Sequence, residues 1–157
     1  MMKEVNAQKL MIDAVSRIRK GKAFKLSSRY LIGVSDLFVK IPNYPGAFVE
    51  VKMNEKPKTK ETVTLGVTPL QAKFMKEFSA AGQPCMVASF LCDDKNELFL
   101  SCRTYDDIAH GDECYKPWEL PTYGYFKVTR GLREKAIVDR LEACLDEFRN
   151  DVKRTWV

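Results

Sequence analysis

The chain has 157 residues, with 26 Lys+Arg against 21 Asp+Glu and a formal net charge of +5 at pH 7. This length predicts one domain, and a hydrophobic content of 45% is that of a globular protein rather than a disordered chain. No apolar run approaches the roughly 18 residues of a membrane span, and charges interrupt the first twenty positions, so we expect a cytoplasmic protein without a signal peptide.

Positive charge is concentrated at the start of the chain. Residues 1–60 hold 13 Lys+Arg and 5 Asp+Glu, a net charge of +8, and residues 61–157 hold the remaining 13 and 16, a net charge of −3. This asymmetry favours an anionic partner for the first part. A solvated, lysine-rich surface is the alternative, and charge alone does not separate the two.

The first half of the chain predicts a helix followed by strands. Residues 4–20 repeat apolar side chains every three or four positions before Gly21, which predicts a helix. Three short segments rich in β-branched and aromatic residues predict strands at 23–31, 35–41 and 47–53. The last two flank a Pro- and Gly-rich turn, so we expect an antiparallel hairpin.

The second half predicts a helix, a hairpin and a long closing helix. After a loop over 54–67, Thr68 precedes a proline in the first position of a helix that ends at Gly82. Residues 84–91 and 97–102 predict paired strands, 104–127 have no clear pattern, and 131–154 predict an amphipathic helix. Its apolar face would either close the core or join two subunits.

Several chemistries are excluded by what the sequence lacks. The chain has one histidine, His110, without the setting of a hydrolase triad, and it has no glycine-rich phosphate loop. Its five cysteines are odd in number and lack the paired spacing of a zinc site, so we expect reduced thiols, with Cys85 and Cys92 packed in the core.

A group of carboxylates remains. Asp36 opens one predicted strand, and Glu50 lies on the next with Lys52 on the same face, because side chains alternate along a strand. These carboxylates, with a main-chain carbonyl and waters, suit Mg²⁺ or Mn²⁺. The alternative is a Glu–Lys pair on an exposed strand face beside an unrelated aspartate.

The order of these residues resembles a nuclease family. Gly33-Val34-Ser35-Asp36-Leu37, then Phe48-Val49-Glu50-Val51-Lys52, then Val67-Thr68-Pro69-Leu70-Gln71, is similar to the PD-(D/E)xK nuclease superfamily and especially to its virus-type replication-repair nuclease branch. The resemblance covers residues 4–103 and implies a restriction-endonuclease-like αβββαβ core followed by a C-terminal helical extension. Ser35 stands where the superfamily usually has proline.

The resemblance also implies roles for individual residues. Asp36 and Glu50 would be metal ligands together with the main-chain carbonyl of Val51, and Glu4 of the first helix would complete the site. Lys52 would position the attacking water, and Gln71 matches a glutamine that this branch places near the site.

Basic side chains near this site are candidates for DNA contacts, because Lys and Arg hold backbone phosphates. The candidates are Lys20, Lys22, Lys25, Arg29, Lys56, Lys58 and Lys60. Each could instead be merely solvated. Tyr30, Tyr44 and Phe48 would flank a nucleic-acid strand or pack in the core.

The sequence therefore predicts a Mg²⁺- or Mn²⁺-dependent endonuclease acting on DNA. The resemblance implies a preference for branched or flapped DNA, such as a Holliday junction, and a homodimer. One alternative is a nucleic-acid-binding module that keeps the fold without turnover. Another is an interaction protein that binds a partner through its C-terminal helix.

Overall fold

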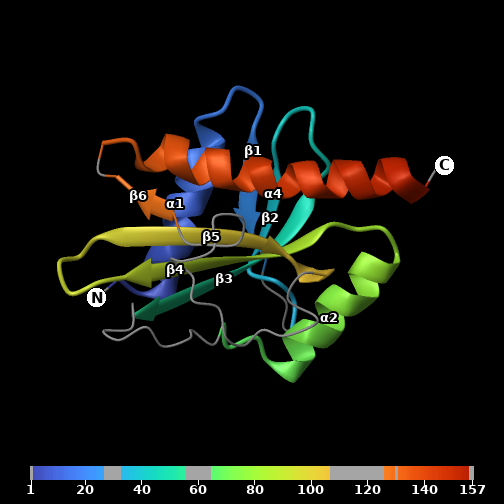
Figure 1. Ribbon diagram of the computed structural model, residues 1–157, viewed down its shortest axis with the longest axis horizontal. Coiled ribbons are helices and arrows are strands. Elements are labelled where there is room, and N and C mark those ends of the chain that lie inside the picture. Colours follow the sequence, from blue (N-terminus) through green and yellow to red (C-terminus); the bar gives the residue numbers. More distant parts are fainter. Residues whose placement is uncertain (1, 27–32, 56–64, 107–125, 130, 156–157) are drawn as a thin grey trace.

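The computed structural model describes residues 2–26, 33–55, 65–106, 126–129 and 131–155 (Figure 1). Within these ranges, three helices accompany a six-stranded mixed sheet, which confirms the α/β class. The helices are α1 (Glu4–Ser16), α2 (Pro69–Ala80) and α4 (Arg133–Thr155). The strands are β1 (Lys22–Lys25), β2 (Leu37–Lys40), β3 (Ala47–Glu55), β4 (Cys85–Cys92), β5 (Leu98–Thr104) and β6 (Phe126–Val128).

The strands lie in the sheet in their order along the chain, from β1 at one edge to β6 at the other. Neighbours are antiparallel except β3 and β4, which are parallel and joined through α2. A parallel pair requires such a crossover, whereas antiparallel strands need only a turn. The predicted hairpin is confirmed, with Leu37 of β2 opposite Val49 of β3.

The main core lies between one face of the sheet and the helices α1 and α4. Side chains such as Val49 and Val51 of β3 pack there with Ile137 and Leu141 of α4, and all four are buried. Figure 1 shows α4 running along the sheet. The apolar face of α4 is therefore used within the chain as far as Phe148, which confirms the core-closing alternative for this part of the helix.

The other face of the sheet carries α2 and a smaller core. Met75 of α2 is buried against Val87 of β4, and Phe48 of β3 packs on the same cluster. Because Val49 and Val51 point to the main core, Glu50 and Lys52 lie on the α2 face. The predicted alternation along β3 is confirmed, and this face holds the candidate site.

The structure departs from the sequence prediction at the end of α1 and at β6. The helix expected to reach residue 20 ends at Ser16, because the chain then turns through Lys20, which has a positive φ of 65°. Gly21 closes this turn, where a Cβ would lie 2.4 Å from the carbonyl oxygen of Val15. Strand β6, in the region without a clear pattern, was not predicted.

Among the cysteines that the structure describes, Cys85, Cys92, Cys102 and Cys144 are free thiols, as expected, and Cys85 and Cys92 are buried. Burial raises the pKa of Cys85 to about 11 and that of Cys102 to about 12, which makes both thiols unreactive. His110 and Cys114 lie outside the described residues. Across the described ranges, no helix combines the length and apolar character that crossing a membrane requires.

Candidate active site

Asp36 lies where β2 and β3 part. These strands are paired from Val39 opposite Ala47 to Leu37 opposite Val49. After Val49, β3 continues to Glu55 paired with β4 but no longer with β2. The N–H of Val51, beyond this register, donates to Oδ2 of Asp36 at 2.8 Å. Because a buried N–H needs an acceptor, this bond fixes the carboxylate at the point of divergence.

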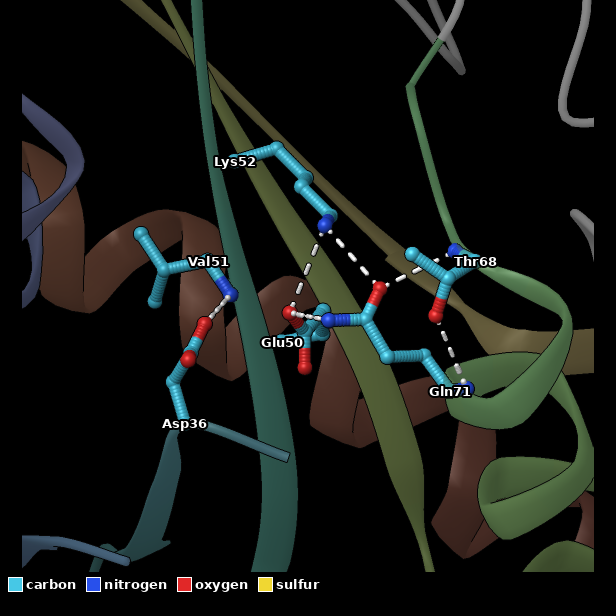
Figure 2. A network of polar contacts seen from close by, with 6 residues as sticks. All are labelled: Asp36, Glu50, Val51, Lys52, Thr68 and Gln71. Atoms are coloured by element: carbon cyan, nitrogen blue, oxygen red, sulfur yellow. Dashed lines mark hydrogen bonds and ion pairs between the residues drawn. The ribbon is translucent and has the colours of Figure 1, made fainter. Parts of the chain in front are cut away.

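Glu50 is buried beside the start of α2, with 2% of its surface exposed. Its Oε1 accepts a hydrogen bond from Nε2 of Gln71 at 2.8 Å and lies 3.5 Å from Nζ of Lys52. Nζ of Lys52 also donates to Oε1 of Gln71 at 3.0 Å. The three side chains form one network (Figure 2), so the alternative of an exposed Glu–Lys pair is wrong.

The amide of Gln71 belongs to this network and to the first turn of α2. Its Oε1 accepts from the N–H of Thr68 at 3.0 Å, and its own N–H donates to Oγ1 of Thr68 at 3.2 Å, which makes a capping box (Figure 2). Because Oε1 accepts from both Lys52 and Thr68, the Nε2 group of the same amide points toward Glu50. The cap of the helix therefore fixes the orientation of the amide in the site.

The electrostatics of the site centre on Glu50. The pKa of its carboxyl group is raised to about 8, first by burial and then by the neighbouring carboxylate of Asp36, while Lys52 opposes both effects. A carboxyl group with this pKa holds a proton at neutral pH unless another cation takes the place of that proton. The arrangement therefore favours a positive charge beside Glu50.

Glycine at position 33 allows the chain before Asp36 to reach α2. Gly33 has a φ of +87°, and a Cβ there would lie 2.5 Å from the carbonyl oxygen of Leu70 and 3.0 Å from the backbone nitrogen of Gln71. Only glycine accepts both this conformation and this close approach. The glycine three residues before Asp36 thus lets this segment pack against the first turn of α2, which carries Gln71.

The two carboxylates fit a divalent cation. Oε2 of Glu50 is buried and has no hydrogen-bond partner among the residues described, which is costly for a carboxylate oxygen without a cation. Within those same ranges, no group of three or more His, Cys, Asp and Glu residues could hold a metal. Mg²⁺ fits the smaller set, because it is commonly held by one or two carboxylates together with water and substrate phosphate.

The structure brings together four of the residues predicted for the site: Asp36, Glu50, Lys52 and Gln71. It does not bring in Glu4, which is exposed in the first turn of α1, and no third acidic residue of the described part joins Asp36 and Glu50. The N–H of Val51 bonds to Asp36, and the role predicted for its carbonyl oxygen as a metal ligand stays a prediction.

Of the residues predicted to contact DNA, Lys20, Lys22 and Lys25 are exposed around β1. Lys22 lies on the α2 face, opposite Lys40, and Lys20 lies in the turn before the strand. Among the candidate aromatic residues, Tyr44 packs against the main core and Phe48 against the smaller one. The remaining candidates, Arg29, Tyr30, Lys56, Lys58 and Lys60, lie outside the described residues.

Thr68 was predicted as a helix cap and not as part of the site. The Thr-Pro-x-Gln spacing was a usable signal, since Ser or Thr followed three positions later by Glu or Gln is the pattern of a capping box. Once Gln71 is assigned to the site, that pattern also links Thr68 to it.

Further polar side chains continue the α2 face beyond the site. Across the sheet, Lys52 is in register with Ser89 of β4, which in turn faces Ser101 of β5. Arg103 of β5 is in register with Val87 of β4, which is in register with Glu50. The three additional polar residues, Ser89, Ser101 and Arg103, are all buried. The sequence signal was the serine within an otherwise apolar strand, which departs from the pattern of a fully buried strand.

Comparison with known proteins adds no relative: no protein-family model matches the chain, and no curated protein is significantly similar to it.

Proposed function

We propose that this protein is a metal-dependent endonuclease that hydrolyses phosphodiester bonds in DNA. The observation that carries the proposal is the pair of carboxylates, Asp36 and Glu50, beside Lys52, with Oε2 of Glu50 buried and unpaired. A divalent cation would explain why the buried carboxyl group of Glu50 lies beside a second acidic group, the partly buried Asp36. The ammonium group of Lys52 adds a positive charge that would attract an anionic substrate.

The order of elements supports the same proposal. From α1 to β4 the chain runs as one helix, three strands, a helix and a strand. This is the αβββαβ order implied by the resemblance to the PD-(D/E)xK superfamily, with Asp36 directly before β2, Glu50 on β3 and Gln71 on the second helix. These placements favour a restriction-endonuclease-like arrangement.

In the proposed reaction, Asp36 and Glu50 would hold Mg²⁺ or Mn²⁺ through their carboxylate oxygens. When bound, the ion offsets negative charge that develops on the phosphoryl oxygens. Lys52 keeps its ammonium group between Glu50 and Gln71, where it can orient the attacking water or attract a phosphate oxygen. Gln71 holds Glu50 and Lys52 in place through its fixed amide.

The charge distribution supports DNA as the substrate. The first 60 residues carry a net charge of +8, and the exposed lysines Lys20, Lys22 and Lys25 lie among them. Cations of this kind hold backbone phosphates whatever the base sequence. We include branched and flapped DNA, Holliday junctions among them, and a homodimer in the proposal, as the resemblance implies.

The test is cleavage of labelled duplex, flap, splayed-arm and four-way-junction DNA with Mg²⁺, with Mn²⁺ and with EDTA. We expect cleavage of at least one substrate with a metal and none with EDTA. Asp36→Asn, Glu50→Gln and Lys52→Ala should each lower the rate by about 100-fold or more, because each removes a group that stabilises charge in the transition state. DNA binding should remain.

A second ion pair in the protein provides the matched control. Glu97 and Lys127 are 3.0 Å apart on the surface, so Glu97→Gln and Lys127→Ala remove the same types of group away from the site and should leave cleavage unchanged. If wild-type protein binds DNA but cuts none of the substrates with either metal, the catalytically silent module is the better description. Sedimentation equilibrium of the same preparation measures the subunit number.

A further inference from the structure

Five phenylalanines form a continuous strip on the α2 face of the sheet, which we call the phenylalanine strip. It starts with Phe24 on the edge strand β1, runs over β2 and β3 and ends on α2. Ring centroids lie 5.6 Å apart from Phe24 to Phe38 and again from Phe38 to Phe48. From Phe48 the strip continues to Phe74 at 5.2 Å and to Phe78 at 5.1 Å.

The outer ends of the strip face solvent. Phe24 is 52% exposed and Phe78 is 39% exposed, although both are large apolar side chains. The strip is also fixed in position, because a Cβ on Gly46 would lie 2.4 Å from the ring of Phe38, so glycine lets that ring rest on the backbone. An exposed, rigid aromatic surface of this kind is a recognised mark of a binding site.

Positive charge borders the same surface. Lys22 and Lys40 are directly opposite each other on β1 and β2, and they share the face of Phe24 and Phe38 because residues two apart on a strand point the same way. Both are exposed, and neither forms an ion pair with any residue of the described ranges, although Nζ of Lys40 donates a hydrogen bond to the carbonyl oxygen of Tyr44. Like charges placed opposite each other weaken strand pairing, whereas an anion between them removes the repulsion.

The strip leads to the candidate active site. Phe48 and Glu50 are two residues apart on β3 and lie on the same face, so roughly 7 Å of strand separates their Cα atoms. The surface therefore combines three properties: exposed aromatic rings at its two ends, neighbouring cations and continuity along β3 with Glu50. Bases stack on such rings only when they are unpaired, because a duplex keeps the faces of its bases covered.

We propose that the phenylalanine strip binds an unpaired strand of DNA, with bases stacked on Phe24 and its neighbours and phosphates beside Lys22 and Lys40, and that this strand continues to the candidate site. This inference rests on the proposed endonuclease function, because it specifies the form of DNA that the candidate site would cut. Binding by the strip can nevertheless be measured without cleavage.

The experiment measures binding of a fluorescein-labelled 20-nucleotide oligothymidylate and of a 20-base-pair duplex in EDTA, by fluorescence anisotropy. Phe24→Ala should weaken binding of the oligothymidylate by roughly tenfold, because stacking on one aromatic ring is lost, and should change duplex binding by less than about twofold. Phe24→Tyr keeps a ring and should bind like wild type.

The matched control is Phe126→Ala. Phe126 is equally aromatic and 39% exposed, but it lies on β6 at the opposite edge of the sheet. Its replacement should leave binding unchanged. Replacing Lys22 and Lys40 together by alanine should weaken binding and reduce the slope of log affinity against log salt by about 1.4, the value for two phosphate contacts to a single strand.

The outcomes separate this inference from the proposed function. Equal binding of oligothymidylate by wild type, Phe24→Ala and the double lysine variant would overturn the inference, even if the protein cuts DNA. A wild-type dimer that Phe24→Ala converts to a monomer without a change in DNA binding would also overturn it, since the strip would then join two copies. Phe24-dependent binding in a protein that never cuts DNA would support the strip and refute the nuclease.

Discussion

At the scale of single residues, the site is organised around one buried carboxyl group. Glu50 meets a second carboxylate, an ammonium and an amide, and one of its oxygens has no partner among the residues described. Lys52 and Gln71 serve Oε1 alone. Because both partners contact Oε1, Oε2 remains available to a proton or a cation. Any function of this site therefore depends on whether Glu50 is protonated, ionised or bound to a cation.

This property gives a prediction for stability against pH in EDTA. The pKa of Glu50 rises from 4.5 to about 8 on folding, first through burial and then through Asp36. Between these values the folded protein binds more protons than the unfolded chain, so the free energy of unfolding should fall as the pH rises from about 4.5 to about 8. Glu50→Gln cannot ionise, and relative to wild type it should gain at least about 2 kcal/mol over this interval.

Urea unfolding at pH 5 to 9 measures the effect, with Glu97→Gln as the control on an exposed glutamate. The control should keep the pH dependence of wild type. Parallel curves for wild type and Glu50→Gln would show that Glu50 ionises in the folded protein as it does in the unfolded chain. Because a proton and a cation compete for Glu50, the affinity for Mn²⁺ should also increase with pH up to about 8.

At the scale of elements, the site depends on three segments that meet through backbone contacts. The end of the β2 ladder leaves the N–H of Val51 free to bond to Asp36. The first turn of α2 supplies Gln71, and Gly33 lets the segment before Asp36 pack against that turn. None of these contacts involves a large buried side chain. The geometry of the site is therefore set by the backbone of the elements, and a small backbone shift would separate its members.

Gly33→Ala tests this dependence. The new methyl group would lie 2.5 Å from the carbonyl oxygen of Leu70, at a φ of +87°. We expect the free energy of unfolding to fall by about 3 kcal/mol, from backbone strain together with the displacement of α2, and metal-dependent cleavage to fall with it.

Gly82→Ala separates the two causes. Gly82 has nearly the same φ, +88°, but no atom lies within 4 Å of its added Cβ. It should therefore lose only about 1 kcal/mol for the left-handed conformation and should keep its cleavage activity. Equal losses in the two variants, measured by urea unfolding, would mean that contact with α2 contributes nothing.

The sequence predicted most elements because their signals are local. The apolar period of α1, the capping residue Thr68 and the alternation along β3 each depend on a few neighbouring positions. Strand β6 has three residues, too few for a period of two to be recognised. The end of α1 was missed because the positive φ of Lys20 has no clear signal in a lysine.

The candidate site was predictable in its members but not in its contacts. Alternation along β3 places Glu50 and Lys52 together, and the capping pattern marks Gln71. The bond from Val51 to Asp36 follows only from knowing where the ladder between β2 and β3 stops, which is a property of the folded sheet. The same holds for the strip of rings, since Phe24, Phe38 and Phe48 become neighbours only through strand register.

At the scale of the whole molecule, the two faces of the sheet serve different purposes. The face under α1 and α4 holds the larger core, and the α2 face holds the polar site and the phenylalanine strip. Folding free energy should therefore come mainly from the first face. A change there should lower stability without altering the chemistry of the other face.

Leu141→Ala is the corresponding test. Leu141 of α4 is fully buried in the main core, so its truncation should lower the free energy of unfolding by about 3 kcal/mol. Leu132→Ala, at a leucine that is 60% exposed just before the same helix, should change it by less than about 0.5 kcal/mol. At a temperature where Leu141→Ala remains folded, its cleavage rate per folded molecule should equal that of wild type. A lower rate would mean that the two faces are coupled.

The hydrogen bonds between Thr68 and Gln71 carry a consequence for how this protein would respond to heat. The same amide that starts α2 also holds Glu50 and Lys52, so fraying of one helical turn releases both partners at once. Ends of helices open at temperatures well below global melting. Turnover would then decline on warming while the sheet is still intact, and the fall would be reversible on cooling.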